Sequence, residues 1–384
     1  MSLCYQMDEK HEMIRMAARE FAESVIKPVA GELDEKEEFS VSLTQEMGNI
    51  GLFGMVVSEE YGGQGLDYIS YIIAVEEVAR VDGSQAATLA AANSLGIYPI
   101  YAFGSEAQRR KYLPDLCRGK TLMGFGLTEP NAGSDAGATH TRAFQDGDSW
   151  VISGRKTLTT NANTSITKGS IVQAVTGVRP NGKADYSCFI VENGTPGFSL
   201  NTLKRKLMWR ASNTAELFLD HCRVSGDAIL GNQGDGFKQM LATLDGGRLS
   251  IAAMGLGCAQ GAYEAALRYS KERIQFGRPI CKQQAVAFKL ADMELKIELA
   301  RNLLYKACWL CENKRPFGKE AAMSKLYCSE IAKEVADEAV QIHGGYGLFK
   351  DYEVERFYRD QRLLQIGEGT SEILRIVISR AIGC

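Results

Sequence analysis

The stretch from residue 171 to residue 191 shows the pattern that decides the fold. It opens with the apolar run Ile171-Val172-Gln173-Ala174-Val175, turns at Pro180-Asn181-Gly182 and closes with Ser187-Cys188-Phe189-Ile190-Val191. Short runs rich in β-branched and aromatic residues, separated by Pro, Asn and Gly, predict antiparallel strands joined by a turn. Similar runs at 150–152 and 215–219 repeat the pattern. Residues 121–230 are therefore expected to form a block of short antiparallel strands.

Helical periodicity flanks this strand block on both sides. Apolar residues recur at helical spacing from residue 13 to residue 26, and we expect that helix to stop near Pro28. Further helical patterns cover 41–50, 67–81, 84–102 and 105–118 before the strands, and 236–271, 281–312, 317–344 and 370–382 after them. The order predicts three domains, at 1–120, 121–230 and 231–384, with a small barrel or sandwich between two helical layers.

The composition excludes several classes of protein. The chain has 384 residues, 45% hydrophobic and 24% charged, as expected for a globular protein of more than one domain. Lys and Arg number 44 against 47 Asp and Glu, whereas proteins that wrap nucleic acid usually carry a basic excess. No apolar run reaches the ~18 residues that a membrane-spanning helix needs. We therefore expect neither nucleic acid nor a membrane as a partner.

The cysteines and histidines indicate neither a disulfide framework nor a metal centre. Ten cysteines are spread from Cys4 to Cys384, whereas a secreted disulfide scaffold would be shorter and denser in cysteine. The only C-x-x-C pair, Cys308 and Cys311, lies in a helical pattern, and no two of the four histidines have ligand spacing. The N-terminus also lacks the apolar core of a signal peptide. We expect reduced thiols in a cytoplasmic protein, or in a mitochondrial matrix protein if a transit peptide has been removed.

Several segments could carry chemistry, and each also has a plain structural interpretation. The loop 126–135, Gly-Leu-Thr-Glu-Pro-Asn-Ala-Gly-Ser-Asp, could offer N–H groups to an anionic ligand or be a simple turn. Residues 245–248 place two glycines early in a helix, each costing about 1 kcal/mol against Ala, which indicates close packing on the backbone. Arg273 could be a helix-dipole partner only. The pair Gly344-Gly345 could be a helix C-cap or allow a ligand to approach.

Glu368 lies between Gly367 and Gly369 in an otherwise apolar and helical neighbourhood. It could be a surface residue in a flexible turn. An acidic residue on a glycine turn can also reach into a cavity, where an apolar environment would raise its pKa towards use as a base.

Taken together, these segments resemble the acyl-CoA dehydrogenase family over nearly the whole chain. The resemblance rests on L-T-E-P-x-A-G-S-D from Leu127, E-R-x-x-F-G from Glu272, G-G-Y-G from Gly344 and E-G-T-S-E from Glu368. It implies an α+β, mostly α fold with an N-terminal helical domain, a middle antiparallel β-domain and a C-terminal four-helix bundle. It also implies FAD as the cofactor, an acyl-CoA substrate, an electron-transferring flavoprotein as electron acceptor, and a homotetramer built as a dimer of dimers.

The resemblance also implies roles for single residues. Glu368 would be the catalytic base, with its backbone N–H and a flavin hydroxyl polarising the thioester oxygen. The residues expected to bind FAD are Phe125, Leu127, Thr128, Gly133, Ser134, Leu158, Thr160, Arg273, Phe276, Gln284, Gln341, Gly344, Gly345, Thr370 and Glu372. Among them, Arg273, Phe276 and Gln284 would reach the FAD of a neighbouring subunit. The residues expected to contact the acyl-CoA are Ser134, Phe237, Asp245, Arg248, Gly367 and Gly369.

Departures from the family pattern bear on the substrate. Gly367 stands where the family commonly has Tyr, Leu158 replaces an aromatic residue by the flavin, and Gly247 stands where isovaleryl-type members place their base. Ala86 aligns with a substrate-binding Arg of glutaryl-type members, which disfavours a dicarboxylyl substrate. We expect a short pocket, wide beside the base, for a branched, cyclic or aryl-bearing acyl group. In the alternative, Trp209 or another residue fills the gap and the substrate is butyryl-CoA.

Two further functions stay open at this point. An enoyl-CoA reductase would run the same chemistry in reverse through a shared transition state, so the sequence does not separate the two directions. A non-catalytic flavin-binding protein could keep the fold, although the presence of Glu368 argues against it.

Overall fold

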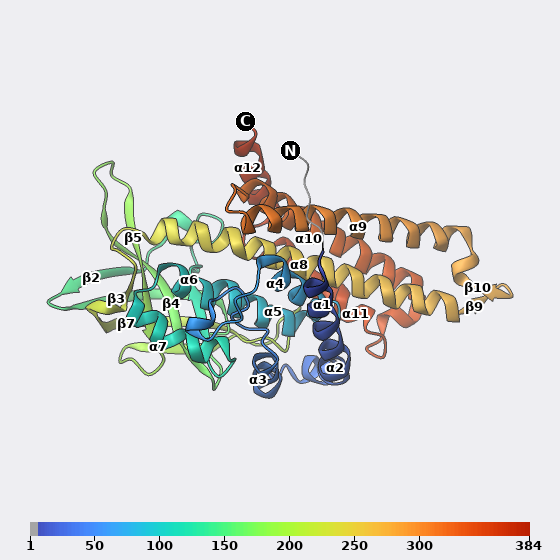
Figure 1. Ribbon diagram of the computed structural model, residues 1–384, viewed down its shortest axis with the longest axis horizontal. Helices are drawn as coiled ribbons and strands as arrows, with labels where there is room; N and C mark the ends of the chain where they lie inside the picture. Colours follow the sequence, from blue (N-terminus) through green and yellow to red (C-terminus); the bar gives the residue numbers. More distant parts are fainter. Residues whose placement is uncertain (1–6) are drawn as a thin grey trace.

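The computed structural model describes residues 7–384, so Cys4 and the first residues of the segment expected to be helical lie outside the described residues. Helices precede and follow the strands, as the sequence predicts (Figure 1), and the strands pair into one eight-stranded sheet where a small barrel or sandwich was expected. The helices before the sheet are α1 (Glu9–Phe21), α2 (Lys27–Lys36), α3 (Val41–Asn49), α4 (Tyr68–Ala79), α5 (Gly83–Ala91), α6 (Tyr98–Phe103) and α7 (Glu106–Cys117).

Pro28 does not end the first helix, so that expectation is wrong. α1 passes through a π-helical turn at Ala22–Ile26 and continues as α2, where Pro28 stands within the first two positions. A proline inside a continuous helix removes one hydrogen bond and crowds the preceding turn, and the π-helical turn just before Pro28 is the kind of local widening that accommodates such a break. The helix ends at Lys36, and Glu37 follows in a left-handed conformation.

The sheet contains the expected hairpin, with Ile171 opposite Ile190 in an antiparallel pair. Its strands are β1 (Leu122–Gly126), β2 (Arg142–Asp146), β3 (Ser149–Thr160), β4 (Thr167–Val178), β5 (Ala184–Glu192), β6 (Phe198–Thr202), β7 (Thr214–Ser225) and β8 (Ile229–Leu230), in the order β6-β7-β3-β2-β4-β5-β8 with β1 beside β4. Most pairs are antiparallel, but β1 and β2 pair with β4 in parallel. Three strands have 12 residues, so they are longer than expected.

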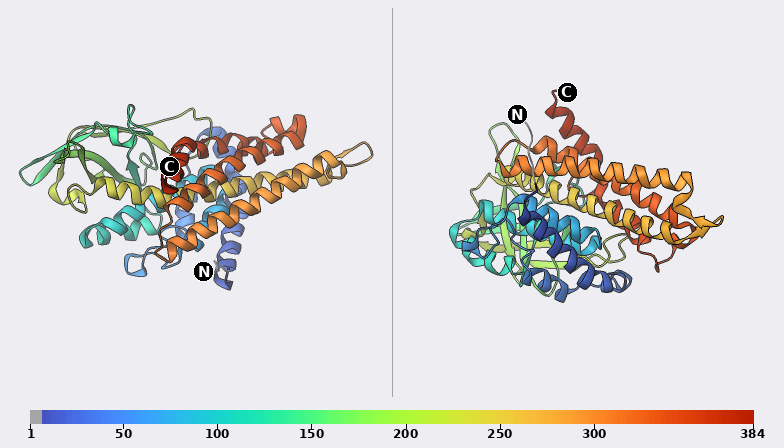
Figure 2. Two further views of the ribbon diagram at one scale, coloured as in Figure 1. Left: turned by 90° about the horizontal axis from the view of Figure 1, so that it is seen from above. Right: turned by 45° about the vertical axis from the view of Figure 1, so that its right-hand side comes forward.

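The C-terminal helices form a long bundle that begins at the sheet. They are α8 (Gly236–Glu272), α9 (Gln284–Glu312), α10 (Gly318–His343), α11 (Val354–Asp360) and α12 (Ser371–Ala381), and the hairpin β9 (Ile274–Gln275) and β10 (Arg278–Pro279) follows α8. α8 runs from the sheet to the opposite end of the molecule, where this hairpin projects (Figures 1 and 2). Residues 249–263, which carry no charged side chain, form the mostly buried middle of α8. The periodicity did not reveal α11.

α8 is also the element that joins the domains. It packs against α9 and α10 in the bundle, against α4 in the N-terminal helices, and against β5 at the sheet. A Cβ on Gly236 would lie 2.7 Å from the Tyr186 backbone, so the first turn of α8 lies directly on the sheet. The nine described cysteines are free thiols, six of them buried. No helix in residues 7–384 combines the length and apolarity needed to cross a membrane.

Candidate active site

The turn that carries Glu368 connects a 3-10 helix at Gln361–Gln365 to α12. Its backbone is left-handed at two successive positions, with φ of 52° at Glu368 and 99° at Gly369. This region is unfavourable for residues other than glycine and persists only where the surroundings impose it. Thr370 then caps α12, because its hydroxyl accepts the Ile373 N–H. The turn therefore holds Glu368 in a strained conformation at the start of a helix.

Two glycines of α8 make room for this turn and for a neighbouring tyrosine. A Cβ on Gly247 would overlap the Glu368 carboxylate and lie 2.8 Å from its Cδ. A Cβ on Gly246 would lie 2.8 Å from the hydroxyl of Tyr68, which donates to the Gly246 carbonyl at 3.2 Å. The close packing expected on these glycines is confirmed. The partner of Gly247 is the expected base itself.

The environment of Glu368 is that of a buried acid. Its Oε2 atom is buried and has no hydrogen-bond partner among the described residues. Burial raises the pKa of Glu368 to about 7, although the charges of Lys325 and Arg248 oppose this rise. Arg248 is itself buried and pairs with Asp245, with 2.5 Å between Nη1 and Oδ1. A carboxyl that titrates near neutrality is well matched to proton transfer, so Glu368 is not a solvated surface residue.

A second part of the site lies where β1 ends and β3 ends. The Thr157 N–H donates to the Thr128 carbonyl at 2.9 Å, which joins the loop after β1 to β3. Leu158 is 64% exposed and left-handed, with φ of 57°. A Cβ on Gly133 would have no atom within 4 Å. The expected flavin-side residues on these two segments are Phe125, Leu127, Thr128, Gly133, Ser134, Leu158 and Thr160. An exposed apolar side chain beside half-buried hydroxyls and an open loop fits a flat, partly apolar cofactor.

Glu129 organises this loop through contacts that the motif alone did not reveal. Its carboxylate pairs with buried Lys156 at 2.8 Å and accepts the N–H groups of His140 and Thr141. Lys156 also donates to the Leu127 carbonyl. Burial by itself would raise the pKa of Glu129, but the hydrogen bond from Lys156 holds it below its ordinary value. Lys156 lies in a strand pattern without a recognisable motif, so sequence reasoning missed this pair.

Phe237 connects the loop to α8. Its ring lies 6.0 Å from the Tyr186 ring, and the Tyr186 hydroxyl donates to the Gly137 carbonyl. Phe237 therefore stands beside the loop that carries Ser134. About two to three turns further along the same helix, Asp245 pairs with Arg248, whose charge acts on Glu368. α8 thus carries three of the expected acyl-CoA contacts, Phe237 near the loop and Asp245 with Arg248 further along; their contact with acyl-CoA stays a prediction.

The other expected FAD residues gather at the opposite end of the bundle. Arg273 lies over the Tyr346 ring at 5.8 Å, and His343 stacks on Tyr269 of α8 at 4.3 Å. Phe276 is 94% exposed on the β9–β10 hairpin, which Figure 1 shows remote from the sheet. The expected residues at this end are Arg273, Phe276, Gln284, Gln341, Gly344 and Gly345. Within one chain they are not brought together with the flavin-side residues, whereas Thr370 and Glu372 begin α12 beside Glu368.

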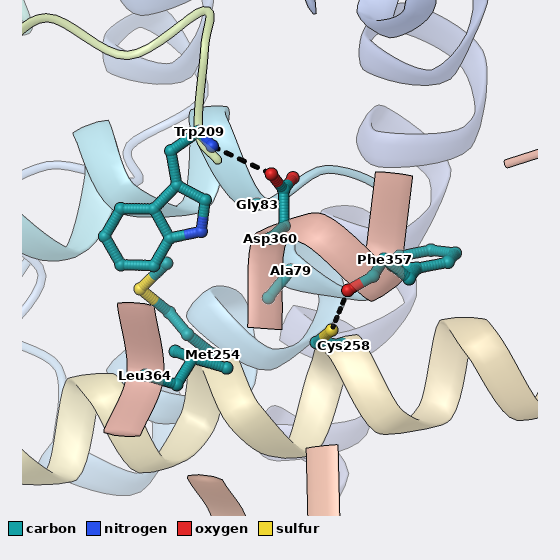
Figure 3. Close-up of a pocket in the computed structure, with 8 residues that line it drawn as sticks. All are labelled: Ala79, Gly83, Trp209, Met254, Cys258, Phe357, Asp360 and Leu364. Carbon is teal, nitrogen blue, oxygen red and sulfur yellow. Dashed lines mark hydrogen bonds between the residues drawn. The ribbon is translucent and has the colours of Figure 1, made fainter. Parts of the chain in front are cut away.

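Leu363, and not Trp209, supplies the atoms nearest to a Cβ on Gly367. The three atoms nearest to a Cβ on Gly367 all belong to Leu363, at 3.5–3.7 Å. Trp209 donates its backbone N–H to Asp360, and its ring points into a small separate cavity (Figure 3). That cavity is lined by Ala79, Gly83, Trp209, Met254, Cys258, Phe357, Asp360 and Leu364. The structure thus does not support Trp209 as the residue that fills the gap.

Comparison with known proteins agrees with this geometry. The family models for the acyl-CoA dehydrogenase N-terminal, middle and C-terminal domains match residues 8–120, 124–222 and 234–383. The probable acyl-CoA dehydrogenase YngJ of Bacillus subtilis is 49% identical, over 98% of this chain and 99% of its own. The short-chain specific acyl-CoA dehydrogenase of Clostridium acetobutylicum is 44% identical with the same coverage. The 3-(aryl)acrylate reductase of Clostridium sporogenes is 41% identical, over 97% of this chain and 98% of its own.

Solved structures show the same likeness. Butyryl-CoA dehydrogenase from Megasphaera elsdenii superimposes with a TM-score of 0.95 and 41% identity, covering 99% of this chain and all of its own. A chain from the structure described as electron transferring flavoprotein of Acidaminococcus fermentans superimposes with a TM-score of 0.95 and 44% identity, with the same coverage. Glutaryl-CoA dehydrogenase from Mycobacterium smegmatis in complex with FADH2 superimposes with a TM-score of 0.93 and 30% identity. The match covers 98% of this chain and 95% of the other. Fold and site define an oxidoreductase. The chain belongs to the acyl-CoA dehydrogenase family.

Proposed function

We propose that this protein removes hydrogen across the α,β bond of a short acyl-CoA thioester and that Glu368 is the base. The observation that carries the proposal is the buried Glu368 carboxylate, which has an unpartnered oxygen and lies against a glycine of α8. A thioester α C–H is a weak acid, so its removal needs a base whose pKa lies near the working pH. The pKa of about 7 that burial gives Glu368 meets this requirement.

FAD is the cofactor, and when bound it accepts the β hydride. The residues that would hold it are the flavin-side group on β1, β3 and the intervening loop. The exposed, strained Leu158 on this surface supports that placement. The buried pair of Glu129 and Lys156 fixes the shape of the loop without needing a ligand.

The protein's own groups perform two tasks in the proposed reaction. The Glu368 carboxylate takes the α proton, and the Glu368 N–H binds the thioester oxygen as negative charge develops there. Among the described residues, no backbone carbonyl accepts that N–H, so it is free for this purpose. Arg248 and Asp245 contact the substrate region from α8, and the buried Arg248 charge also favours the ionised form of Glu368.

Gly367 supports an acyl group that is wide beside the base. A Cβ at this position would meet Leu363 only at ordinary contact distances, so a side chain could begin here and glycine withholds it. The name of the reductase from Clostridium sporogenes combines an aryl group with a three-carbon acid. Both observations favour a branched, cyclic or aryl-bearing acyl group of short reach. Butyryl-CoA is the second candidate because two of the relatives are named for short-chain or butyryl substrates.

The direction of the reaction and the redox partner belong to the proposal as well. We propose dehydrogenation with an electron-transferring flavoprotein as acceptor, which the neighbour from Acidaminococcus fermentans supports. The reductase name of one relative favours the reverse direction as the alternative. A homotetramer is supported by the exposed Phe276 and by Phe288, Leu295 and Leu299, which form an exposed apolar face on α9. The cytoplasmic location stays a prediction.

A screen of acyl-CoA thioesters tests this function. The purified yellow protein is mixed without oxygen with butyryl-, isobutyryl-, cyclohexanecarbonyl- and 3-phenylpropionyl-CoA, and the loss of flavin colour is followed. A saturated thioester that bleaches the flavin supports dehydrogenation. If none does, while the dithionite-reduced protein transfers hydride to cinnamoyl-CoA, the reductase is the function. If neither occurs, the enzyme proposal is overturned.

A further inference from the structure

Two side chains of α10 hold the backbone on both sides of Glu368. The Ser329 hydroxyl shares its one hydrogen between the Leu364 carbonyl at 2.8 Å and the Lys325 carbonyl of its own helix at 2.6 Å. The Lys325 ammonium donates to the Gly369 carbonyl at 2.6 Å. Lys325 and Ser329 are four residues apart and therefore lie on the same face of the helix. Both are fully buried. The strained turn is thus tied at two points to one face of one helix.

Lys325 is an uncommon residue to find fully buried, because burying an ammonium is costly unless the group is paired. Burial lowers the pKa of Lys325 to about 8, while the charge of Glu368 supports the protonated form. Its bond to the Gly369 carbonyl satisfies one of its three donors. The sequence places Lys325 in the middle of a helix that shows no catalytic motif, so only the structure relates it to the turn.

We propose that Lys325 is a positioning residue for the base: its ammonium holds the left-handed turn through the Gly369 carbonyl and stabilises the ionised Glu368 carboxylate inside the protein. The inference rests on the proposed function, in which Glu368 removes the α proton. Beyond that function, the proposal states that Glu368 needs the buried Lys325 cation of α10 to be correctly placed and to be ionised near neutral pH.

The groups around the turn give Lys325 a role that no neighbour shares. Arg248 on α8 is the second cation that acts on Glu368, but it is already paired with Asp245. The Glu368 charge also acts on Tyr71 of α4, whose hydroxyl is hydrogen-bonded to the Ser250 hydroxyl. Glu372 on α12 acts on Lys325 and adds a negative charge. Lys325 alone among these groups combines a positive charge with a bond to the backbone of the turn.

The test is a titration of the Glu368 carboxyl itself, which does not require turnover. Infrared difference spectra of the FAD-loaded protein, with the spectrum of Glu368→Gln subtracted, follow the protonated carboxyl as pH is raised. Lys325→Met removes both the charge and the bond, so the midpoint should move above that of the wild type by about one pH unit or more. At pH 7, kcat should fall at least tenfold and recover in part at pH 9, with little change in KM.

Two further variants separate charge from geometry. Lys325→Gln can still donate to the Gly369 carbonyl but has no charge, so it should show the same upward shift and serves if Lys325→Met does not fold. Ser329→Ala loses one carbonyl bond and no charge, so it should lower kcat and leave the midpoint in place. Lys333→Met changes an exposed lysine of the same helix and should change neither quantity.

A wild-type midpoint and a kcat within threefold of wild type in both Lys325 variants would overturn this role for Lys325. Failure of the proposed function would look different. In that case Glu368→Gln would remain active, whatever the titration of the Lys325 variants shows.

Discussion

The Glu368 carboxylate occupies the space that a side chain on Gly247 would need. The two residues come from different elements: Glu368 from the turn before α12, and Gly247 from a position about three turns into α8. A carboxylate can therefore reach this space from the turn or from α8, but not from both. In this chain the base comes from the turn, and the glycine on the helix leaves the space that its carboxylate occupies.

Gly247→Ala tests that arrangement. Alanine is favoured over glycine in a helix by about 1 kcal/mol, and the overlapping atom ends a flexible side chain that can move aside. We therefore expect an unchanged or higher melting temperature together with a fall in kcat of at least tenfold. Gly31→Ala, at an exposed position of α2, is the matched control and should leave kcat unchanged. Wild-type kcat in Gly247→Ala would contradict the overlap.

The raised pKa of Glu368 predicts how stability depends on pH. With a folded pKa of about 7 and an ordinary value of 4.5, the folded state binds the proton more tightly than the unfolded state. The free energy of unfolding should therefore fall as pH rises from 4.5 to 7 on account of this group. Glu368→Gln removes this loss. Its melting temperature relative to wild type should be higher at pH 8 than at pH 5, and an equal difference at both pH values would refute the shift.

Gly367→Tyr tests the width of the acyl pocket. The residue has room for a Cβ, and a phenol ring there would fill space beside the base. The variant should lose turnover of a branched, cyclic or aryl-bearing thioester while sparing or improving that of butyryl-CoA. Values of kcat/KM for both substrates decide the matter. A wild-type preference for butyryl-CoA of tenfold or more, about 1.4 kcal/mol in the transition state, would rule out the wide pocket.

Arg273→Ala tests the contribution of one subunit to the cofactor of another. Arg273 lies beside Tyr346 at the end of the bundle remote from the flavin-side residues. Its loss should weaken FAD retention and subunit association together, as measured by the flavin absorbance that co-sediments with each species. A wild-type monomer with full FAD occupancy in sedimentation would show that no neighbour is needed.

The sequence predicted those parts of the fold that repeat along the chain and those parts of the site that lie in motifs. The periodicity located the long helices and the hairpin of β4 and β5. It missed α11, which has only seven residues. It misread Pro28 because the π-helical turn that lets the helix continue past the proline leaves no signal in the periodicity. Lys325 and Lys156 were missed for another reason. Their partners are backbone carbonyls and a carboxylate distant in sequence, and no local pattern encodes such contacts.

The most direct test of the central claim is a comparison of wild type and Glu368→Gln in a single turnover. Each FAD-loaded protein is mixed without oxygen with the thioester that best bleaches the wild type, and the flavin absorbance is followed by stopped flow. Loss of a general base should slow flavin reduction by roughly 10²–10⁴-fold, while FAD content and thioester affinity stay near the wild-type values. If Glu368→Gln keeps a tenth or more of the wild-type rate, Glu368 is not the base.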